Sequence, residues 1–224
     1  MPSPRPAVIG VWTTITLLCV MVVALPLTFG SAGGPSRFDL DLTHAIDTTV
    51  GHAPSLYRVL VSPSDSPLVI GLLIIGVIVL IWRKLRHDAI FLAVVPELAV
   101  GINETILKPL WHRHLHDYLS YPSGHTFQYA AVGTGFVLIM RSRRMRAVSA
   151  TVLLLLIPPI TIGMVGLGYH YPTDVIAGAC ASMATVLALH RLARHVSAAR
   201  SAREHPCSCT SRDRRPAASR WTSE

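Results

Sequence analysis

Two short stretches decide how this chain folds and where its chemistry lies: Tyr121-Pro-Ser-Gly-His125 and His170-Tyr-Pro-Thr-Asp174. Each places a histidine where an apolar, helix-like segment begins. Ser123 is predicted to cap the first of these helices, so that free backbone N–H groups and the positive end of the helix dipole favour an anion. Asp174 follows His170 by four residues, close enough to hold the imidazole ring by a hydrogen bond. Two histidines and a carboxylate at such helix starts are suited to phosphate chemistry.

The composition places the remainder of the chain in a membrane. Its 224 residues are 51% hydrophobic and only 14% charged, and the mean hydropathy of +0.47 is too high for a soluble domain of this size. Apolar runs long enough to cross a bilayer, or nearly so, lie at about 7–28, 67–82, 88–107, 125–140, 147–168 and 172–190. We therefore predict an all-α fold, an integral membrane bundle of six helices.

Four segments are predicted along the chain. Residues 1–28 form the first transmembrane helix, and 29–66 form an exterior loop whose amphipathic part, Phe38 to Val50, lies along the membrane surface. Residues 67–192 form the core with five transmembrane helices, and 193–224 form a disordered basic cytoplasmic tail. The alternative for the first segment is a cleaved signal peptide, although its apolar run is longer than is usual for one.

The positions of lysine and arginine predict the orientation. Sixteen of the 20 basic residues fall on one side of the six-helix topology, and four fall on the other: Arg37, Arg58, Lys108 and Arg113. Because short cytoplasmic segments retain positive charge, both termini are predicted to be cytoplasmic and both histidine motifs to open toward the exterior. This distribution accounts for the net charge of +8 without a nucleic-acid partner, since the basic residues are not interleaved with stacking aromatics.

The loop before the fourth span and the two histidine motifs together resemble the type 2 phosphatidic acid phosphatases, which share a helical core with the vanadium haloperoxidases. The resemblance rests on Lys108, on Pro-Ser-Gly-His at 122–125 and on the His-x-x-x-Asp pattern at 170–174, in that order and over roughly residues 67–192. It implies the six-helix fold of that family and a lipid phosphatase in the cell membrane that needs neither a metal nor a cofactor.

The resemblance also implies a role for each matching residue. His170 would attack phosphorus, Asp174 would orient and charge its ring, and His125 would protonate the departing lipid oxygen and then activate water. Four groups would hold the phosphoryl oxygens: Lys108, Arg113, Ser123 and the Gly124 N–H. The substrate would be a lipid phosphate or diphosphate at the exterior leaflet, with its tail between helices.

Two arginines of the family pattern are missing. Leu115 and His116 stand where the family has Arg-Pro, and Gly163 and Met164 stand where it has Ser-Arg. Arg113 is the obvious substitute for a lost phosphate ligand. The nearby histidines add positive charge when they are protonated: His112, His114 and His116.

Several alternatives remain open at this stage. The alternating triplet His112, His114 and His116, with Asp117, also fits a zinc site on an extended segment. A lipid-phosphate binding or transport-associated membrane protein would keep the pocket but lack turnover, and a membrane packing protein would carry the motifs by chance. The patterns fit polyprenyl diphosphate, polyprenyl monophosphate, phosphatidic acid and phosphatidylglycerophosphate equally, and they leave the oligomeric state open.

Overall fold

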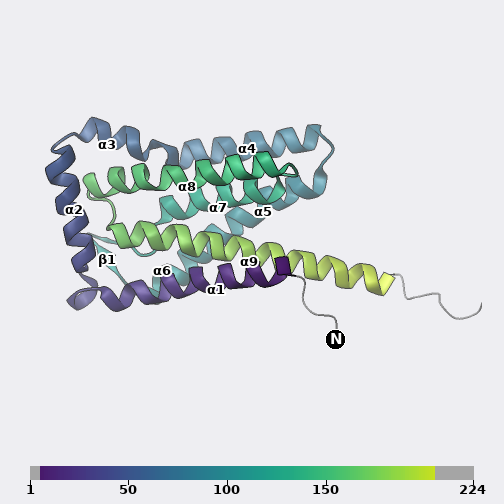
Figure 1. The fold of residues 1–224 in the computed structure, drawn as a ribbon, viewed down its shortest axis with the longest axis horizontal. Helices are drawn as coiled ribbons and strands as arrows, with labels where there is room; N and C mark the ends of the chain where they lie inside the picture. Colours follow the sequence, from purple (N-terminus) through teal and green to yellow (C-terminus); the bar gives the residue numbers. More distant parts are fainter. Residues whose placement is uncertain (1–5, 205–224) are drawn as a thin grey trace, which may run out of the picture. The chain divides into compact units, whose positions relative to one another are not determined.

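The computed structural model describes residues 6–204, and these form an all-α chain with one small hairpin (Figure 1). The chain divides into two compact units, residues 1–190 and 191–224. The first unit holds both histidine motifs. Its α-helices, with the last one running on into the second unit, are α1 (Pro6–Ala24), α2 (Arg37–Val50), α3 (Pro54–Val61), α4 (Ser66–Trp82), α5 (Arg86–Ile102), α6 (Lys108–Trp111), α7 (Gly124–Ile139), α8 (Arg143–Gly166) and α9 (Pro172–Glu204).

Short elements join these helices. Three are 3₁₀ turns, namely η1 (Leu25–Thr28), η2 (Ser31–Gly33) and η3 (Ser62–Ser64), and one is a π-helical turn, η4 (Asn103–Leu107). Strands β1 (His114–Leu115) and β2 (Tyr118–Leu119) pair antiparallel, with His114 opposite Leu119. This hairpin occupies the loop that precedes the first histidine motif.

Within residues 6–204, five helical stretches are long and apolar enough to cross a membrane. They are Ile9–Thr28, Pro54–Trp82, Arg86–Trp111, Arg143–Gly166 and Pro172–Ser197. They coincide with five of the six predicted spans, and the sixth, predicted at 125–140, is the shorter helix α7 of 16 residues. At 1.5 Å per residue α7 is about 24 Å long, against about 30 Å for the hydrocarbon core. It packs between α4, α5 and α8, so its apolar residues are buried by protein on several sides.

Helix α2 covers the end of the bundle at which the histidine motifs begin, and it crosses that end at a steep angle to the long helices (Figure 1). It lies where the sequence predicts an amphipathic helix. A capping box starts it: the Ser36 hydroxyl accepts a hydrogen bond from the Asp39 N–H at 3.1 Å, and the Asp39 carboxylate accepts one from the Ser36 N–H at 2.9 Å. Ile46 of α2 packs with Tyr57 of α3 and Val165 of α8.

The core of the first unit joins helices that are distant in the sequence. One cluster contains Val22 of α1, Val95 of α5 and Phe127 of α7 with Val186 of α9. Between α7 and α9, the Ser182 hydroxyl donates a hydrogen bond to the Phe127 carbonyl at 2.8 Å. Because that cluster includes α1, residues near the start of the chain belong to the same packed body as the histidine motifs.

Helix α9 continues to Glu204, so residues 193–204 of the predicted tail are helical. Alanine, arginine and glutamate are good helix formers, and this stretch is rich in them. The remainder of the predicted disordered tail, residues 205–224, lies outside the described residues.

Candidate active site

The two histidine motifs meet where α9 begins beside the start of α7. The Ser123 N–H donates a hydrogen bond to the Asp174 carbonyl at 3.0 Å. A Cβ added at Gly178 would lie 2.7 Å from the Ser123 carbonyl oxygen, so only glycine lets α9 approach this closely. The result is that the rings of His125 and His170 lie 6.5 Å apart between centroids, with their planes inclined by 67°.

His170 faces Asp174 on one side and Tyr118 on another. Its Nδ1 lies 3.7 Å from an Asp174 carboxylate oxygen, which is an ion-pair distance but longer than a hydrogen bond. Among the described residues Nδ1 has no hydrogen-bond partner. The Tyr118 ring stands edge-on to the His170 ring with centroids 6.0 Å apart, and the Tyr118 hydroxyl donates to the Tyr169 carbonyl. This orientation directs the other ring nitrogen, Nε2, away from the carboxylate.

Lys108 is the first residue of α6, directly after the π-helical turn η4, and its side chain reaches the start of α7. A Cβ added at Gly124 would lie 3.3 Å from Lys108 Nζ and 3.0 Å from a Glu104 carboxylate oxygen. Glu104 and Lys108 themselves form an ion pair at 2.8 Å. π-Helical turns inside α-helices are frequent at functional sites, and this one precedes the lysine that lies beside Gly124. A single ammonium group thus stands at the helix opening, partly neutralised by Glu104, which the sequence did not single out.

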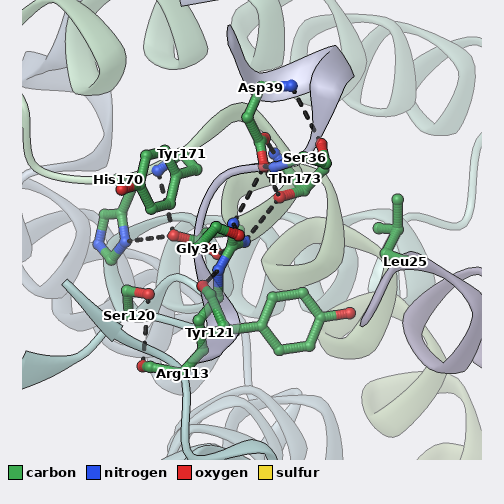
Figure 2. Close-up of polar contacts among 12 residues, drawn as sticks. Leu25, Gly34, Ser36, Asp39, Arg113, Ser120, Tyr121, His170, Tyr171 and Thr173 are labelled. Carbon is green, nitrogen blue, oxygen red and sulfur yellow. Dashed lines mark hydrogen bonds and ion pairs between the residues drawn. The ribbon is translucent and has the colours of Figure 1, made fainter. Parts of the chain in front are cut away.

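Arg113, predicted as a phosphate ligand, has protein partners for its side chain in this structure. Its side chain is fully buried, and all five of its N–H donors are used (Figure 2). Nε donates to the Gly33 carbonyl at 2.9 Å, and one terminal nitrogen donates to the Gly34 carbonyl at 3.2 Å. Phe29 covers the guanidinium at 3.7 Å from its ring centroid. The guanidinium therefore has no N–H left to offer a phosphate in this arrangement.

The remaining donors of Arg113 join two carboxylates. One terminal nitrogen donates to Asp174 at 2.6 Å and to the Thr173 hydroxyl at 2.7 Å, and the other donates to Asp39 at 3.0 Å. Asp39 also accepts from the Thr173 N–H and from the Thr173 hydroxyl, both at 2.9 Å. Asp39, Arg113 and Asp174 have no exposed side-chain surface, and we refer to these three residues as the buried triad.

Sequence reasoning missed Asp39. Its capping role could have been predicted, because the pattern Ser36-x-x-Asp39 fits a capping box at a helix start. Nothing in the sequence, however, pairs Asp39 with Thr173, which follows 134 residues later. Burial alone would raise the pKa of the Asp39 carboxyl, but hydrogen bonds from Ser36, Thr173 and Arg113 outweigh burial and hold that pKa below its usual value.

The structure also places the other predicted residues. Ser123 is the N-cap residue of α7 by position, but its side chain makes no cap hydrogen bond; its hydroxyl is buried and lies 3.3 Å from that of Thr126. Met164 is fully buried in a core cluster with Val61, Ile160 and Val175. A side chain at position 164 therefore points into the packing of α3, α8 and α9.

The three loop histidines do not converge. The rings of His112 and His114 are nearly parallel with centroids 6.3 Å apart, whereas His116 stacks on Tyr118. His112 and His116 both have positive φ values, which breaks the extended alternation that a shared ligand face requires. Within residues 6–204 there is no group of three His, Cys, Asp or Glu side chains that could hold a metal ion.

Tyrosine side chains surround this site. Burial, and secondarily the nearby Asp174 carboxylate, raise the pKa of Tyr118 and that of Tyr121. Tyr121 is fully buried, and its hydroxyl donates to the Val22 carbonyl of α1 at 2.5 Å. Both phenols are therefore neutral over the physiological range and act as hydrogen-bond donors.

Fold and site together define a multi-pass helical membrane protein in which two histidines meet beside a buried aspartate. Residues 96–197 match the PAP2 superfamily. The crystal structure of a transmembrane PAP2-type phosphatidylglycerolphosphate phosphatase from Bacillus subtilis superposes with a TM-score of 0.60 at 17% identity, covering 83% of this chain and 96% of that chain. No curated protein sequence matches the chain significantly. The predicted resemblance to the PAP2 superfamily is thus confirmed, and so is the all-α membrane fold.

Proposed function

We propose that this protein is a membrane phosphatase that hydrolyses a lipid phosphate or diphosphate at the exterior leaflet through a phosphohistidine intermediate. The observation that carries the proposal is the pair of rings, His125 and His170, whose centroids are 6.5 Å apart with Nδ1 of His170 turned toward Asp174. That spacing suits a phosphoryl group held between a nucleophile and a general acid. The match of residues 96–197 to the PAP2 superfamily supports the same reaction class.

In the first half of the reaction, the lone pair on Nε2 of His170 attacks phosphorus while the bond from phosphorus to the lipid oxygen breaks. His125 donates its proton to that departing oxygen. The phosphorylated ring keeps a proton on Nδ1 and carries positive charge. Asp174, 3.7 Å from Nδ1, balances that charge and needs to move less than about 1 Å to accept a full hydrogen bond.

In the second half, the now neutral His125 takes a proton from a water molecule. The water oxygen bonds to phosphorus, the phosphorus–nitrogen bond breaks, and its electron pair returns to Nε2 of His170. Inorganic phosphate leaves, and both histidines are restored to their starting protonation states. The same residue acts first as acid and then as base, as the two half-reactions require.

Lys108 and the Gly124 N–H are proposed to hold the phosphoryl oxygens. The ammonium and the amide lie together at the positive end of α7, where developing negative charge is stabilised. The Ser123 hydroxyl stays a prediction, since it would have to turn from Thr126 toward the phosphate. Arg113 is revised from phosphate ligand to a supporting residue, because its donors are already taken.

A lipid substrate is supported by an apolar groove of about 440 Å³ beside α7. Its lining includes Tyr129, one helical turn beyond His125, and Val132 and Phe136 of the same helix, together with residues of α4 and α8. Exposed Leu68 and Leu72 form its rim, so a hydrocarbon tail in the bilayer has direct access to it. The solved relative is named a phosphatidylglycerolphosphate phosphatase, and phosphatidylglycerolphosphate is one such lipid phosphate.

The test is phosphate release by the detergent-purified protein, with EDTA present, from polyprenyl diphosphate, polyprenyl monophosphate, phosphatidic acid and phosphatidylglycerophosphate. We expect release from at least one of them. His170→Ala and His125→Ala should each abolish turnover while the protein remains folded, and the double variant should lose no more than either single one, because the two groups act in one sequence of steps. Near wild-type release by either single variant would refute the assignment.

A second candidate is a lipid-phosphate binding or transport-associated protein without turnover. It is favoured by the buried Met164 and by Leu115, which leave this site without the two arginines of the family pattern. Tight binding of phospholipid or vanadate with no phosphate release from any of the four lipids would select this candidate over the phosphatase.

A further inference from the structure

The buried triad connects helix α2 to the proposed nucleophile through contacts that reach far across the sequence. Asp39 belongs to the first turn of α2, Arg113 to the loop before β1, and Asp174 to the first turn of α9. Asp39 accepts four hydrogen bonds, from Ser36, Arg113 and, twice, Thr173. A buried carboxylate and a buried guanidinium with every polar group paired form a rigid unit, because any displacement leaves a charge uncompensated.

The triad ends at the carboxylate that faces His170. One oxygen of Asp174 is held by Arg113 at 2.6 Å, and the other accepts the Tyr171 N–H at 3.1 Å and faces Nδ1 of His170. Arg113 therefore determines where the second oxygen points. In turn Asp39 fixes Arg113, since it holds the opposite edge of the same guanidinium.

The charge of the triad is unbalanced. Two carboxylates and one guanidinium leave a net charge of −1 in a region without solvent exposure. The groups that face His170 are Asp174 from α9, His125 from α7 and Tyr118 from β2. Tyr118 is neutral, and the charges of the Lys108–Glu104 pair offset each other. In the proposed mechanism His125 becomes neutral once it has donated its proton, so the excess negative charge of the triad then stabilises the positively charged ring of the phosphohistidine.

We propose that Asp39 is a positioning residue for the nucleophile: through Arg113 and Thr173 it fixes Asp174 opposite Nδ1 of His170, and its charge helps to stabilise the cationic ring of the phosphohistidine. This inference rests on the proposed phosphatase function and extends it to α2, which carries none of the family motifs. It assigns α2 a part in the chemistry, beyond covering the end of the bundle.

The charge of the triad predicts how turnover depends on Asp39. Removing the Asp39 charge makes the triad neutral and withdraws support from the cationic ring of the phosphohistidine. In Asp39→Asn, kcat should therefore fall by about 10-fold. KM should change little, because Asp39 does not touch the substrate.

The experiment measures kcat and KM separately for the detergent-purified full chain, using whichever lipid phosphate the wild type hydrolyses. Asp41→Asn is the matched control, with the same change on the same helix at an exposed position, and it should reproduce the wild-type kcat and KM. Asp39→Glu keeps the charge and should lower kcat less than Asp39→Asn does. A kcat of Asp39→Asn equal to that of the wild type, or a rise in KM with kcat unchanged, overturns the inference.

Arg113→Lys tests the same positioning role if Asp39→Asn does not fold. It preserves the net charge of the triad but cannot hold two carboxylates in a fixed fork. We expect a lower kcat and an unchanged KM. A raised KM with kcat unchanged would return Arg113 to the phosphate and refute the positioning role. Absence of phosphate release by the wild type itself would refute the proposed function, an outcome distinct from both of these.

Discussion

A buried arginine with two carboxylates stabilises a protein only as a complete set. Taking the charges of Asp39, Arg113 and Asp174 out of water is costly, and the five hydrogen bonds of the guanidinium offset that cost. Removal of any one member leaves the others uncompensated, which typically costs roughly 3–5 kcal/mol. The same residues thus serve both the fold and the orientation of the site, which is why tests of function must separate kcat and pH effects from simple unfolding.

The lowered pKa of Asp39 predicts how this contribution to stability depends on pH. Hydrogen bonds hold the folded-state pKa below the value of about 3.9 expected for an unfolded chain. The ionised carboxylate therefore contributes its full stabilisation above that value and loses it as the pH falls through the folded-state pKa. The difference in unfolding temperature between wild type and Asp39→Asn should be largest near neutral pH and should shrink below about pH 4.

Thermal unfolding of both proteins in detergent, from about pH 3 to about pH 8, measures this difference across the titration of the carboxyl. The exposed Asp41→Asn variant again serves as the control and should follow the wild type at every pH. A difference that is constant across the range, or one that grows toward low pH, would show that the Asp39 carboxylate is not the ionised partner of Arg113.

At the scale of residues, motif spacing predicted the site where interacting residues are also close together in the sequence. His170 and Asp174 are four residues apart at the start of one helix, so their pairing could be predicted, and the structure puts the ring and the carboxylate 3.7 Å apart. Arg113 could be recognised as unusual but not placed, because its partners come from positions near 34, 39 and 174. A sequence shows which residues are charged, whereas the choice between a phosphate and a carboxylate as partner is made by tertiary packing.

Among the elements, the contact of α3 with α8 explains one departure from the family pattern. A Cβ added at Gly163 would lie 2.7 Å from the Tyr57 carbonyl oxygen and 2.8 Å from the Val61 nitrogen, so α8 accepts α3 only with glycine there. The next residue, Met164, packs against Val61 and Ile160. At the two positions where the family has Ser-Arg, this chain thus has residues that pack α8 against its neighbours.

This packing predicts the result of restoring the arginine of the family pattern. Met164→Arg would bring an unpaired cation into a fully buried position and should destabilise the protein by several kcal/mol, on the order of 3–5 kcal/mol, without raising kcat. Thermal unfolding and phosphate release measure the two effects. Met164→Leu is the matched control and should cost less than about 1.5 kcal/mol, since it conserves volume and polarity.

A Met164→Arg variant with wild-type stability and increased turnover would contradict this account. It would mean that the side chain at 164 can leave the core and reach the phosphate. The packing of α3 against α8 would then not prevent an arginine at position 164 from binding the phosphate.

Hydropathy predicted the elements well where length and apolarity agree. Five predicted spans coincide with long apolar helices. Helix α7 is shorter and ends at Ile139. Because α4, α5 and α8 surround it, it does not need the length of a lipid-facing helix. The hairpin of β1 and β2 was not predicted, because two-residue strands carry no period, and its turn depends on the positive φ of His116.

Across the whole molecule, residues near the start of the chain take part in the site. The Tyr121 hydroxyl donates to the carbonyl of Val22, and Phe29 covers both the Arg113 guanidinium and, edge-on at 5.2 Å, the Tyr121 ring. The carbonyls of Gly33 and Gly34 accept from Arg113. Removal of residues up to the η1 turn as a signal peptide would take away the Tyr121 partner, which favours retention of the first span in the working protein.

The orientation of the molecule in the membrane decides which leaflet supplies the substrate. In the topology predicted from the sequence, sixteen of the 20 lysine and arginine residues fall on the same side as both termini and the loop around Arg144. Because short basic segments resist translocation, that side is expected to be cytoplasmic, and the loop around His116 is expected to be exterior. Cysteines introduced singly at these two positions test it, in a background from which the four native cysteines have been removed. A membrane-impermeant thiol reagent should label the His116→Cys variant in intact cells and the Arg144→Cys variant only after permeabilisation. The reverse pattern would put both histidine motifs at the cytoplasmic leaflet; the chemistry of His125 and His170 could stand, but its lipid phosphate would then have to come from the inner leaflet.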